Sequence, residues 1–371
     1  MPIPRGNMLE AALQYLRCPA CKGELSVRAD RTRAGEVEEG ALRCGGCGAE
    51  YPVTRGVPRL LRDTADAFNV ETVRRFEWQW RRFNQAQLEL APRLRELFLE
   101  WVRPLQRESF TGKVVLDAGC GMGRWTLQAA GMRAKDVVAL DLGGSVDIAY
   151  ANTAHLDNVH VVQGDIMELP VAPVFDVICC IGVLHHMPDP GAAFASLARM
   201  LAPGGTISAW VYGRENNGWL LATVDRLRST VTSRLPGRVL YALSTALSAG
   251  VYAATHWVYA GERGERLPYG EYMRYLGNYG FDTINNIVFD QLTPGIAHYL
   301  PREEVERWLA DADFAESGLI HRNGNSWLLW GTRQGAAVGA ASLSRGSGAG
   351  VTAAGAVSPA VAAGARVPRG G

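Results

Sequence analysis

The chain has 371 residues, of which 47% are hydrophobic and 20% are charged, and 38 basic side chains nearly balance 37 acidic ones. This composition fits a soluble globular protein, and the net charge of +1 excludes an overall electrostatic footprint for nucleic acid or for an anionic membrane. The N-terminal stretch MPIPRGNMLEAALQYLRC lacks the charged start and the continuous apolar core of a secretion signal, so we expect a cytoplasmic protein.

Four of the seven cysteines form two C-x-x-C pairs near the N-terminus. The pairs are Cys18 with Cys21 and Cys44 with Cys47, and 22 residues separate them. Each pair places two sulfurs on one tight turn, and two pairs complete a tetrahedron of thiolates around zinc. Disulfides are the alternative, but a reducing compartment favours the metal. Four thiolates leave zinc no open position, so we predict a structural zinc ribbon over residues 1–62.

A helical pattern follows over residues 63–110, where Phe76, Trp80 and Phe83 are spaced four and three apart. The segment FEWQWRRF (76–83) is dense in aromatic and basic side chains. It is consistent with a helix that docks through its aromatic face, and equally with a lid over a binding site.

Short apolar runs alternate with helical patterns over residues 111–212. The strand candidates are KVVLDA (113–118), DVVALD (136–141), NVHVVQ (158–163), FDVICCI (175–181) and GTISAWVY (205–212). Near-continuous apolar strands separated by helices are typical of a parallel sheet that is covered on both faces. We therefore predict a doubly wound α/β domain.

The remaining chain adds to this core. About 85 residues follow the fifth strand, which is too many for a simple crossover, so residues 213–300 are predicted to form a helical insertion. A last amphipathic helix and two strands around an Asn323-Gly324 turn complete the core over residues 301–334. Residues 335–371 have almost no large side chains, and we predict a disordered tail there.

The loop VLDAGCGMGRW leads from the first core strand into a helix. It has glycine at three alternate positions, Gly119, Gly121 and Gly123. A nicotinamide or flavin dinucleotide site would need another glycine where the chain has Arg124. At the ends of the next two strands, Asp141 can accept both hydroxyls of a ribose, and Asp165 can accept from the amine of an adenine. The alternative is that the glycines only form a tight turn and the aspartates cap helices.

In this order, LDAGCGMGRW, ALDLG, GDIMELP, FDVICCIGVLHHMPDP and LAPGGTISAWVYG resemble the motif series of class I S-adenosylmethionine-dependent methyltransferases, in the broad group that includes the quinone-biosynthesis enzymes. The resemblance implies a Rossmann-like fold and S-adenosylmethionine as the cofactor. It also implies the residues that hold the cofactor, which are Asp117, Gly119, Gly121, Gly123, Asp141, Leu142, Asp165, Ile166 and Ile181.

Two histidines follow the fourth strand, where this fold brings the methyl acceptor near the sulfonium. Either His185 or His186 is therefore a candidate general base. The alternative is that they only line the site, because this loop often carries histidine in the resembling families without demonstrated proton transfer.

The cysteine ribbon with its ending YPVTRGVPRLL is similar to the small zinc domains that activate methyltransferases and that occur fused to bacterial ones. One family of bacterial rRNA guanine methyltransferases shares this domain order, so an rRNA or tRNA base is an alternative acceptor. Acidic residues balance the basic residues of the ribbon, however, and no basic run stands out. A second alternative is a non-catalytic module that binds a partner protein.

Insertions beside the carboxyl edge of such a sheet carry specificity, so we expect residues 213–300 to shape the acceptor site. The candidates for acceptor or lid contacts are Trp78, Trp80, Arg81, Tyr252, Tyr272, Tyr275, His298 and Tyr299. The segments 269–281 and 289–300 also bring Tyr269, Arg274 and Asp290, a mixture suited to flat or amphipathic ligands. As a set they favour a small organic acceptor of lipophilic or aromatic character, while ordinary helix packing is the alternative for each alone.

The uncharged stretch 239–259 is long enough to cross a bilayer as a helix. Its stripe of hydroxyls, Gly250 and His256 disfavour a lipid environment, so we predict no transmembrane span. We expect its aliphatic stripe to be buried, and its hydroxyl stripe to face the acceptor cavity or a second subunit of a homodimer.

Overall fold

The computed structural model describes residues 8–62, 67–88 and 91–335. The disordered tail that we predict from residue 335 onward falls on residues 336–371, which lie outside the described residues.

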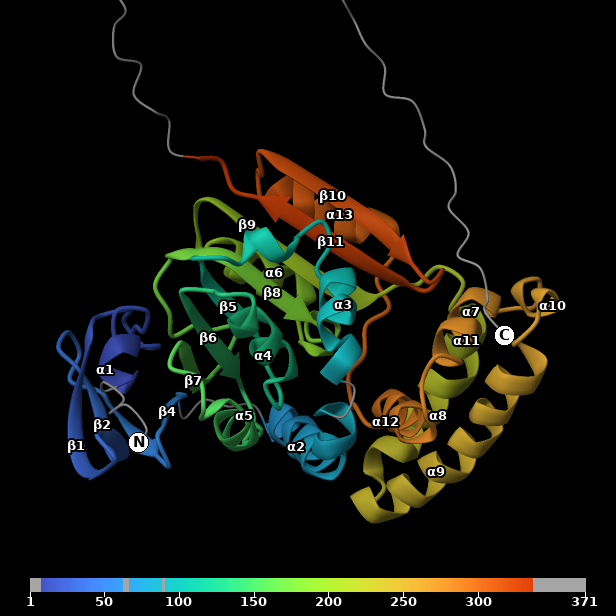
Figure 1. Ribbon diagram of the computed structural model, residues 1–371, viewed down its shortest axis with the longest axis horizontal. Coiled ribbons are helices and arrows are strands. Elements are labelled where there is room, and N and C mark those ends of the chain that lie inside the picture. Colours follow the sequence, from blue (N-terminus) through green and yellow to red (C-terminus); the bar gives the residue numbers. More distant parts are fainter. Residues whose placement is uncertain (1–7, 63–66, 89–90, 336–371) are drawn as a thin grey trace, which may run out of the picture. The chain divides into compact units, whose positions relative to one another are not determined.

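The core is a sheet of parallel strands with helices between them (Figure 1). In chain order its elements are β5 (Val114–Ala118), α4 (Arg124–Gly131), β6 (Asp136–Asp141), α5 (Val146–Thr153), β7 (Val159–Gly164), β8 (Phe175–Ile181), α6 (Pro190–Ala198) and β9 (Leu201–Tyr212). In space these strands run β7-β6-β5-β8-β9, and neighbouring strands are parallel. The predicted doubly wound α/β fold is confirmed, and the strand order reverses at β5.

Alternate side chains of the strands point to opposite faces of the sheet. Leu116 lies in one hydrophobic core with Phe194 of α6, whereas its neighbour Val115 lies in a second core with Trp125 of α4. Both faces are therefore buried, which explains why the strands are near-continuous apolar runs in the sequence.

Two antiparallel strands extend the sheet beyond β9. Helix α13 (Arg302–Asp311) comes first, then β10 (Glu316–Arg322) and β11 (Ser326–Thr332), and β11 pairs with β9 while β10 forms the edge. Asn323 and Gly324 in the turn have positive φ angles of 51° and 66°, which these residue types tolerate. The predicted helix, strand pair and turn are confirmed.

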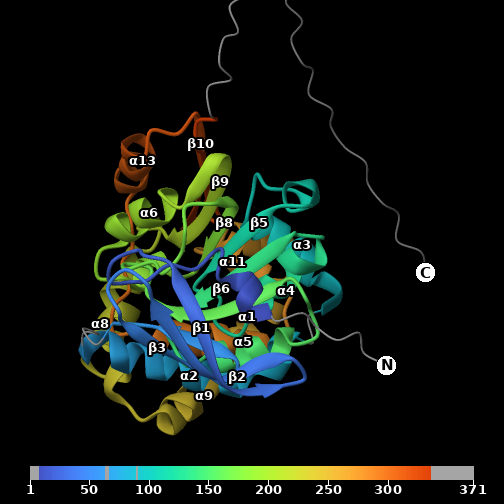
Figure 2. The same cartoon turned by 90° about the vertical axis from the view of Figure 1, so that its left-hand side faces the viewer.

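The N-terminal ribbon joins the same sheet. Its elements are α1 (Met8–Ala12) and the antiparallel strands β1 (Leu25–Arg33), β2 (Glu36–Cys44), β3 (Glu50–Thr54) and β4 (Val57–Leu60). Strand β4 pairs in parallel with β7, with Arg59 opposite Gln163 and Leu60 opposite Gly164. Figure 2 faces the ribbon strands and the core behind them. The ribbon and the core therefore share one continuous sheet, a pairing that the sequence did not predict.

A buried polar cluster also holds the ribbon to the core. Tyr15 is buried, with 4% of its surface exposed. Its hydroxyl donates to Oδ2 of Asp136 at 2.5 Å. His160 lies on the other side, with its Nε2 2.9 Å from Oδ1 of the same carboxylate. Burial and the hydrogen bond to Asp136 raise the pKa of Tyr15 above its ordinary value, so the phenol stays a donor.

The other helices lie before the core in the sequence or in the insertion. They are α2 (Ala67–Leu88) and α3 (Ala91–Trp101) before the core, and α7 (Gly218–Leu220), α8 (Arg226–Thr230), α9 (Gly237–Ala253), α10 (Glu262–Glu265), α11 (Gly270–Leu276) and α12 (Phe281–Leu292) in the insertion. Helix α12 packs between α9 and α2. Within the described residues, no helix has both the length and the apolar character that a membrane span requires.

The orientation that we predict for the stretch 239–259 is wrong at its centre. Ser244 and Ser248 of α9 are fully buried, whereas Leu247 is 45% exposed. The hydroxyls of both serines lie near Oδ1 of Asn285 on α12, at 3.0 and 3.3 Å. Small residues let the two helices approach closely, and their hydroxyls satisfy a buried amide that an aliphatic face would leave without a partner.

We expect Tyr15→Phe to lower the free energy of unfolding by about 1–3 kcal/mol, because it leaves a partly buried carboxylate oxygen of Asp136 without its donor. Urea denaturation followed by circular dichroism measures this loss. The matched control is Tyr259→Phe, since the hydroxyl of Tyr259 donates to the carbonyl of Pro268 at an exposed position. The control should change stability by less than about 0.5 kcal/mol. Equal effects of the two variants would contradict the role of the buried cluster.

Candidate functional site

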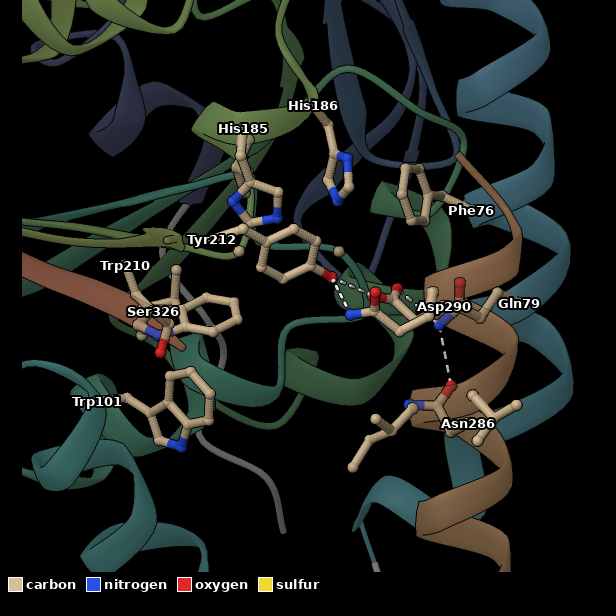
Figure 3. Close-up of a pocket in the computed structure, with 18 of the residues that line it drawn as sticks. Phe76, Gln79, Trp101, His185, His186, Trp210, Tyr212, Asn286, Asp290 and Ser326 are labelled. Carbon is tan, nitrogen blue, oxygen red and sulfur yellow. Dashed lines mark hydrogen bonds between the residues drawn. The ribbon is translucent and has the colours of Figure 1, made fainter. Parts of the chain in front are cut away.

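A cavity of about 910 Å³ lies at the carboxyl ends of the parallel strands. Its walls come from the glycine loop after β5, from the ends of β6, β7 and β8, from α2, and from α11 and α12 of the insertion. Figure 3 shows the half of the cavity where side chains from β9, α2 and α12 converge. Ligands of doubly wound sheets bind at this edge, so the cavity is the candidate active site.

The glycine loop leaves no room for side chains at two of its positions. Gly119 has φ +80° and a Cβ there would lie 2.2 Å from Val183, while Gly121 has φ +54° and a Cβ there would lie 3.0 Å from the ring of Trp80. Both glycines line the cavity, so a ligand can reach the backbone there. Gly123, with φ +83°, is outside the lining and backs onto helix α5 instead.

Asp141 ties this loop to the end of β6. Its Oδ2 accepts from the backbone N–H of Gly121 at 2.8 Å, and its Oδ1 accepts from the N–H of Gly143 at 2.8 Å and from the hydroxyl of Ser145 at 3.0 Å. Burial raises the pKa of Asp141, and these three hydrogen bonds oppose that shift. The carboxylate is therefore fixed in the cavity wall beside the glycines.

The other residues implied for the cofactor lie in two places. Asp165, Leu142, Ile166 and Ile181 line the cavity with Asp141. Asp165 accepts from the N–H of Met167 at 2.8 Å, and burial raises its pKa. Asp117 lies below the loop and outside the lining, where its Oδ2 accepts from the hydroxyl of Thr126 at 2.6 Å.

Both candidate bases line the cavity, but their surroundings differ. His185 is fully buried and stacks on Tyr212 with ring centroids 3.8 Å apart. Neither of its nitrogens has a hydrogen-bond partner among the described residues, and burial lowers its pKa well below the ordinary value. A neutral imidazole without a partner to orient it is a poor choice for directed proton transfer.

His186 has a defined tautomer. Its Nδ1 lies 2.9 Å from the carbonyl oxygen of Ile296, and a carbonyl can only accept, so Nδ1 carries the proton. Burial lowers the pKa of His186, which keeps the ring neutral. Nε2 then carries the lone pair, and His186 is the better placed of the two to accept a proton.

Only some residues of the predicted lid segment 76–83 line the cavity. Phe76, Gln79 and Trp80 line the cavity. Trp78 and Arg81 do not line it, since Trp78 stacks on Phe289 of α12 at 5.2 Å and Arg81 pairs with Glu77 on its own helix. The helix therefore serves as a cavity wall and as a docking helix at the same time.

The candidates in the insertion also fall into two groups, those that line the cavity and those that do not. Tyr272, Tyr275 and Tyr299 line the cavity. Tyr252 lies outside the lining and stacks on His256 at 4.0 Å, and His298, also outside it, uses its backbone N–H to hold the carbonyl of His185 at 2.8 Å.

Several lining residues were not among the sequence candidates. Among them are Trp101, Arg124, Trp210 and Tyr212. Trp210 and Tyr212 close the fifth core strand, and that position could have identified them, because strand ends face the site in this fold. Asp290, which stands in the insertion segment 289–300 named from the sequence, also lines the cavity.

The four predicted zinc ligands come together in the ribbon. The sulfurs of Cys18, Cys21, Cys44 and Cys47 all lie within 4.8 Å of one another. The sulfurs of Cys18 and Cys47 are 3.7 Å apart, and those of Cys21 and Cys44 are 3.4 Å apart. Four sulfurs at about 2.3 Å from one zinc would be roughly 3.8 Å from one another, which is close to these distances. The backbone N–H groups of Cys47 and Gly46 lower the pKa of the Cys44 thiol to about 6, which favours the thiolate that zinc binds.

Comparison with known proteins bears on both parts of the chain. The model of the methyltransferase domain family matches residues 115–205, and the model of Trm112p-like proteins matches residues 12–56. A ubiquinone biosynthesis O-methyltransferase of Erwinia tasmaniensis is 30% identical over 167 residues, which cover 43% of this chain and 68% of that protein. The chain belongs to the class I S-adenosylmethionine-dependent methyltransferases.

Other relatives match over shorter regions. A ubiquinone biosynthesis O-methyltransferase of Pseudomonas putida (strain GB-1) is 32% identical over 133 residues, which cover 34% of this chain and 56% of the relative. The chain thus spans about half the length of such relatives. Among solved structures, a chain from the complex of the Haloferax volcanii Trm112 methyltransferase activator with a methyltransferase has a TM-score of 0.41 and 16% identity, covering 73% of this methyltransferase and 100% of that chain.

S-adenosylmethionine and zinc are the cofactor and the structural metal that these two domains indicate. The residues fit both groups. The glycine loop leaves backbone accessible where Cβ atoms would clash, and an acidic side chain stands at the end of β6 and of β7. The cysteine cluster supplies four soft ligands at tetrahedral spacing.

The purified methyltransferase should contain one zinc ion per chain, and Cys44→Ser should lower that content and the melting temperature, because the ribbon is too small to fold on its hydrophobic core alone. Mass-spectrometric metal analysis and thermal unfolding measure the two effects. Cys120→Ala is the control, since Cys120 is buried in the core and lies outside the cluster. A zinc content unaffected by Cys44→Ser would contradict the assignment.

Asp117 should make stability depend on pH. Burial raises its pKa to about 6, whereas an aspartate in an unfolded chain titrates near about 3.9. The folded state therefore holds this proton more tightly, and its contribution to the free energy of unfolding is complete below about pH 4 and is lost as pH rises through about 6.

Asp117→Asn keeps an acceptor for Thr126 and does not ionise. Compared with this variant, the wild type should lose up to about 3 kcal/mol of stability between about pH 4 and 7 in the absence of cofactor. Urea denaturation across that range measures the difference, and parallel pH curves for the two proteins would refute the prediction.

Proposed function

We propose that the protein transfers a methyl group from S-adenosylmethionine to a small organic acceptor of aromatic or lipophilic character. One observation carries this proposal: a single cavity runs from the glycine loop and the two strand-end aspartates to a chamber lined by Trp101, Trp210 and Tyr212. The relatives named as ubiquinone biosynthesis O-methyltransferases support an organic acceptor.

We assign the parts of the chain as follows. Residues 1–62 form the ribbon, 63–110 the linker and lid, 111–212 the cofactor domain, 213–300 the acceptor subdomain, and 301–334 the end of the core. In the cofactor half, Asp141 accepts from a ribose hydroxyl at the lone pair of Oδ2 that the loop leaves free, Asp165 accepts from the adenine amine, and Gly119 and Gly121 admit the methionine part to the backbone.

Bound S-adenosylmethionine supplies an activated methyl group on a sulfonium. The protein's task is to align the acceptor with that group and to exclude water, and the tryptophans and tyrosines of the chamber do both. His186 accepts the acceptor's proton at Nε2, while the carbonyl of Ile296 holds its Nδ1–H. His185 positions the ring of Tyr212 by stacking.

An RNA acceptor is less well supported, because several arginines of the ribbon already pair with acidic side chains. Arg28 lies 3.3 Å from Asp30, and Arg31 lies 2.9 Å from Glu38. These partners leave less positive charge for a phosphate backbone.

The test supplies S-adenosylmethionine with a labelled methyl group to the purified protein, together with either total RNA or a small-molecule extract of the native host. We expect label in the extract only, and Asp141→Ala should reduce both cofactor affinity and label transfer by about tenfold or more, because it removes a charged partner of the ribose. Label in RNA alone would overturn the acceptor class. Cofactor binding without transfer to either pool would instead indicate the partner-binding module.

A further inference from the structure

One acidic side chain stands apart from the others in the cavity. Four charged side chains line it among the described residues, besides the two histidines: Arg124, Asp141, Asp165 and Asp290. The first three belong to the glycine loop and the strand ends, which form the cofactor half. Asp290 lies on α12, in the part of the cavity that Trp101, Trp210 and Tyr212 line, which we call the aromatic half.

Two neutral donors from different elements hold this carboxylate (Figure 3). The hydroxyl of Tyr212 on β9 donates to Oδ2 of Asp290 at 3.1 Å, and Nε2 of Gln79 on α2 donates to Oδ1 at 3.1 Å. Gln79 also donates to Oδ1 of Asn286 at 3.0 Å, which fixes its amide orientation. The carboxylate is therefore rigidly placed, and its charge is not cancelled by its donors.

No lysine or arginine in the described ranges forms an ion pair with Asp290. Arg228, the buried arginine of the insertion, pairs with Asp225 instead. A carboxylate has about four lone-pair sites, and two are used here, so each oxygen of Asp290 can accept a further hydrogen bond. A partly buried acidic group in an apolar wall gains free energy when a bound molecule supplies that donor.

We propose that Asp290 is a specificity residue that accepts a hydrogen bond from the methyl acceptor, which therefore carries a hydroxyl or ammonium group on an aromatic or lipophilic frame. This role rests on the proposed function, because it assigns the aromatic half of the cavity to the acceptor. A carboxylate at the same place on the acceptor would meet a like charge at Asp290, so the cavity selects against acidic acceptors.

The test uses three probes that share a naphthalene frame: 1-naphthylmethylamine, 1-naphthalenemethanol and 1-naphthoate. Calorimetric titration measures their binding to the full-length protein saturated with S-adenosylhomocysteine. We expect the amine to bind about tenfold or more tightly than the carboxylate, with the alcohol between them. Asp290→Asn should reduce that ratio to about threefold or less, since it removes the charge and keeps the shape.

The matched control is Asp282→Asn, because Asp282 is an exposed acid on the same helix and lies outside the cavity lining. It removes the same charge and should leave the preference of the wild type unchanged. If Asp290→Asn does not fold, Asp290→Ser, which also removes the charge, replaces it in the same titrations.

Two failures are distinguishable in this design. Absence of S-adenosylhomocysteine binding by the wild type would overturn the proposed function. Three outcomes with intact binding of S-adenosylhomocysteine would overturn the role of Asp290. They are equal affinity for the three probes, no binding of any probe, and a preference for the amine that survives Asp290→Asn.

Discussion

The shared carboxyl edge of the parallel strands is the constraint on which the site depends. Because β5, β6, β7 and β8 all end there and the strand order reverses at β5, the loops after β5 and β8 diverge and leave space between them. The hydrogen bond from the N–H of Gly121 to Asp141 fastens the loop after β5 to the end of β6. The cofactor half is thus built from backbone and short side chains on rigid strands, which preserves its geometry.

The aromatic half rests on rigid strand only at Trp210 and Tyr212 of β9, and its helices are held by a small hydrophobic cluster and by polar contacts. Gln79 connects α2 to α12, Tyr212 connects β9 to α12, and Ser244 connects α9 to the same helix through Asn285. Apolar contacts alone would let these helices slide, whereas buried hydrogen bonds are directional and costly to break. Helix α12 is therefore the common support of the chamber, and it also carries Asp290.

The features that the sequence predicted well are those that depend on local pattern. The β-branched runs around Val115 and Val137 identified the strands, and Asp141 and Asp165, named because they stand at strand ends, both line the cavity. The zinc ligands were found because two short C-x-x-C turns determine their own geometry. The face of α9 was mispredicted because Ser244 is buried only by its pairing with Asn285, some forty residues later. The hydrogen bonds of Asp290 with Tyr212 on β9 and Gln79 on α2 could not be predicted for the same reason.

The pairing of β4 with β7 changes what the zinc ribbon does for this methyltransferase. The ribbon pairs with the last two residues of β7, Gln163 and Gly164, and so covers the carboxyl end of a strand that would otherwise be the edge of the core. The ribbon also holds the segment that follows β7: the N–H of Arg17 donates to the carbonyl of Pro170 at 2.8 Å, and Nζ of Lys22 donates to the carbonyl of Leu169 at 3.0 Å. That segment begins with Asp165, which we propose for the adenine, and Lys22 directly follows the ligand Cys21. The fold of the zinc knuckle therefore places a cation against the segment that carries Asp165, and the ribbon belongs to the scaffold of the candidate site.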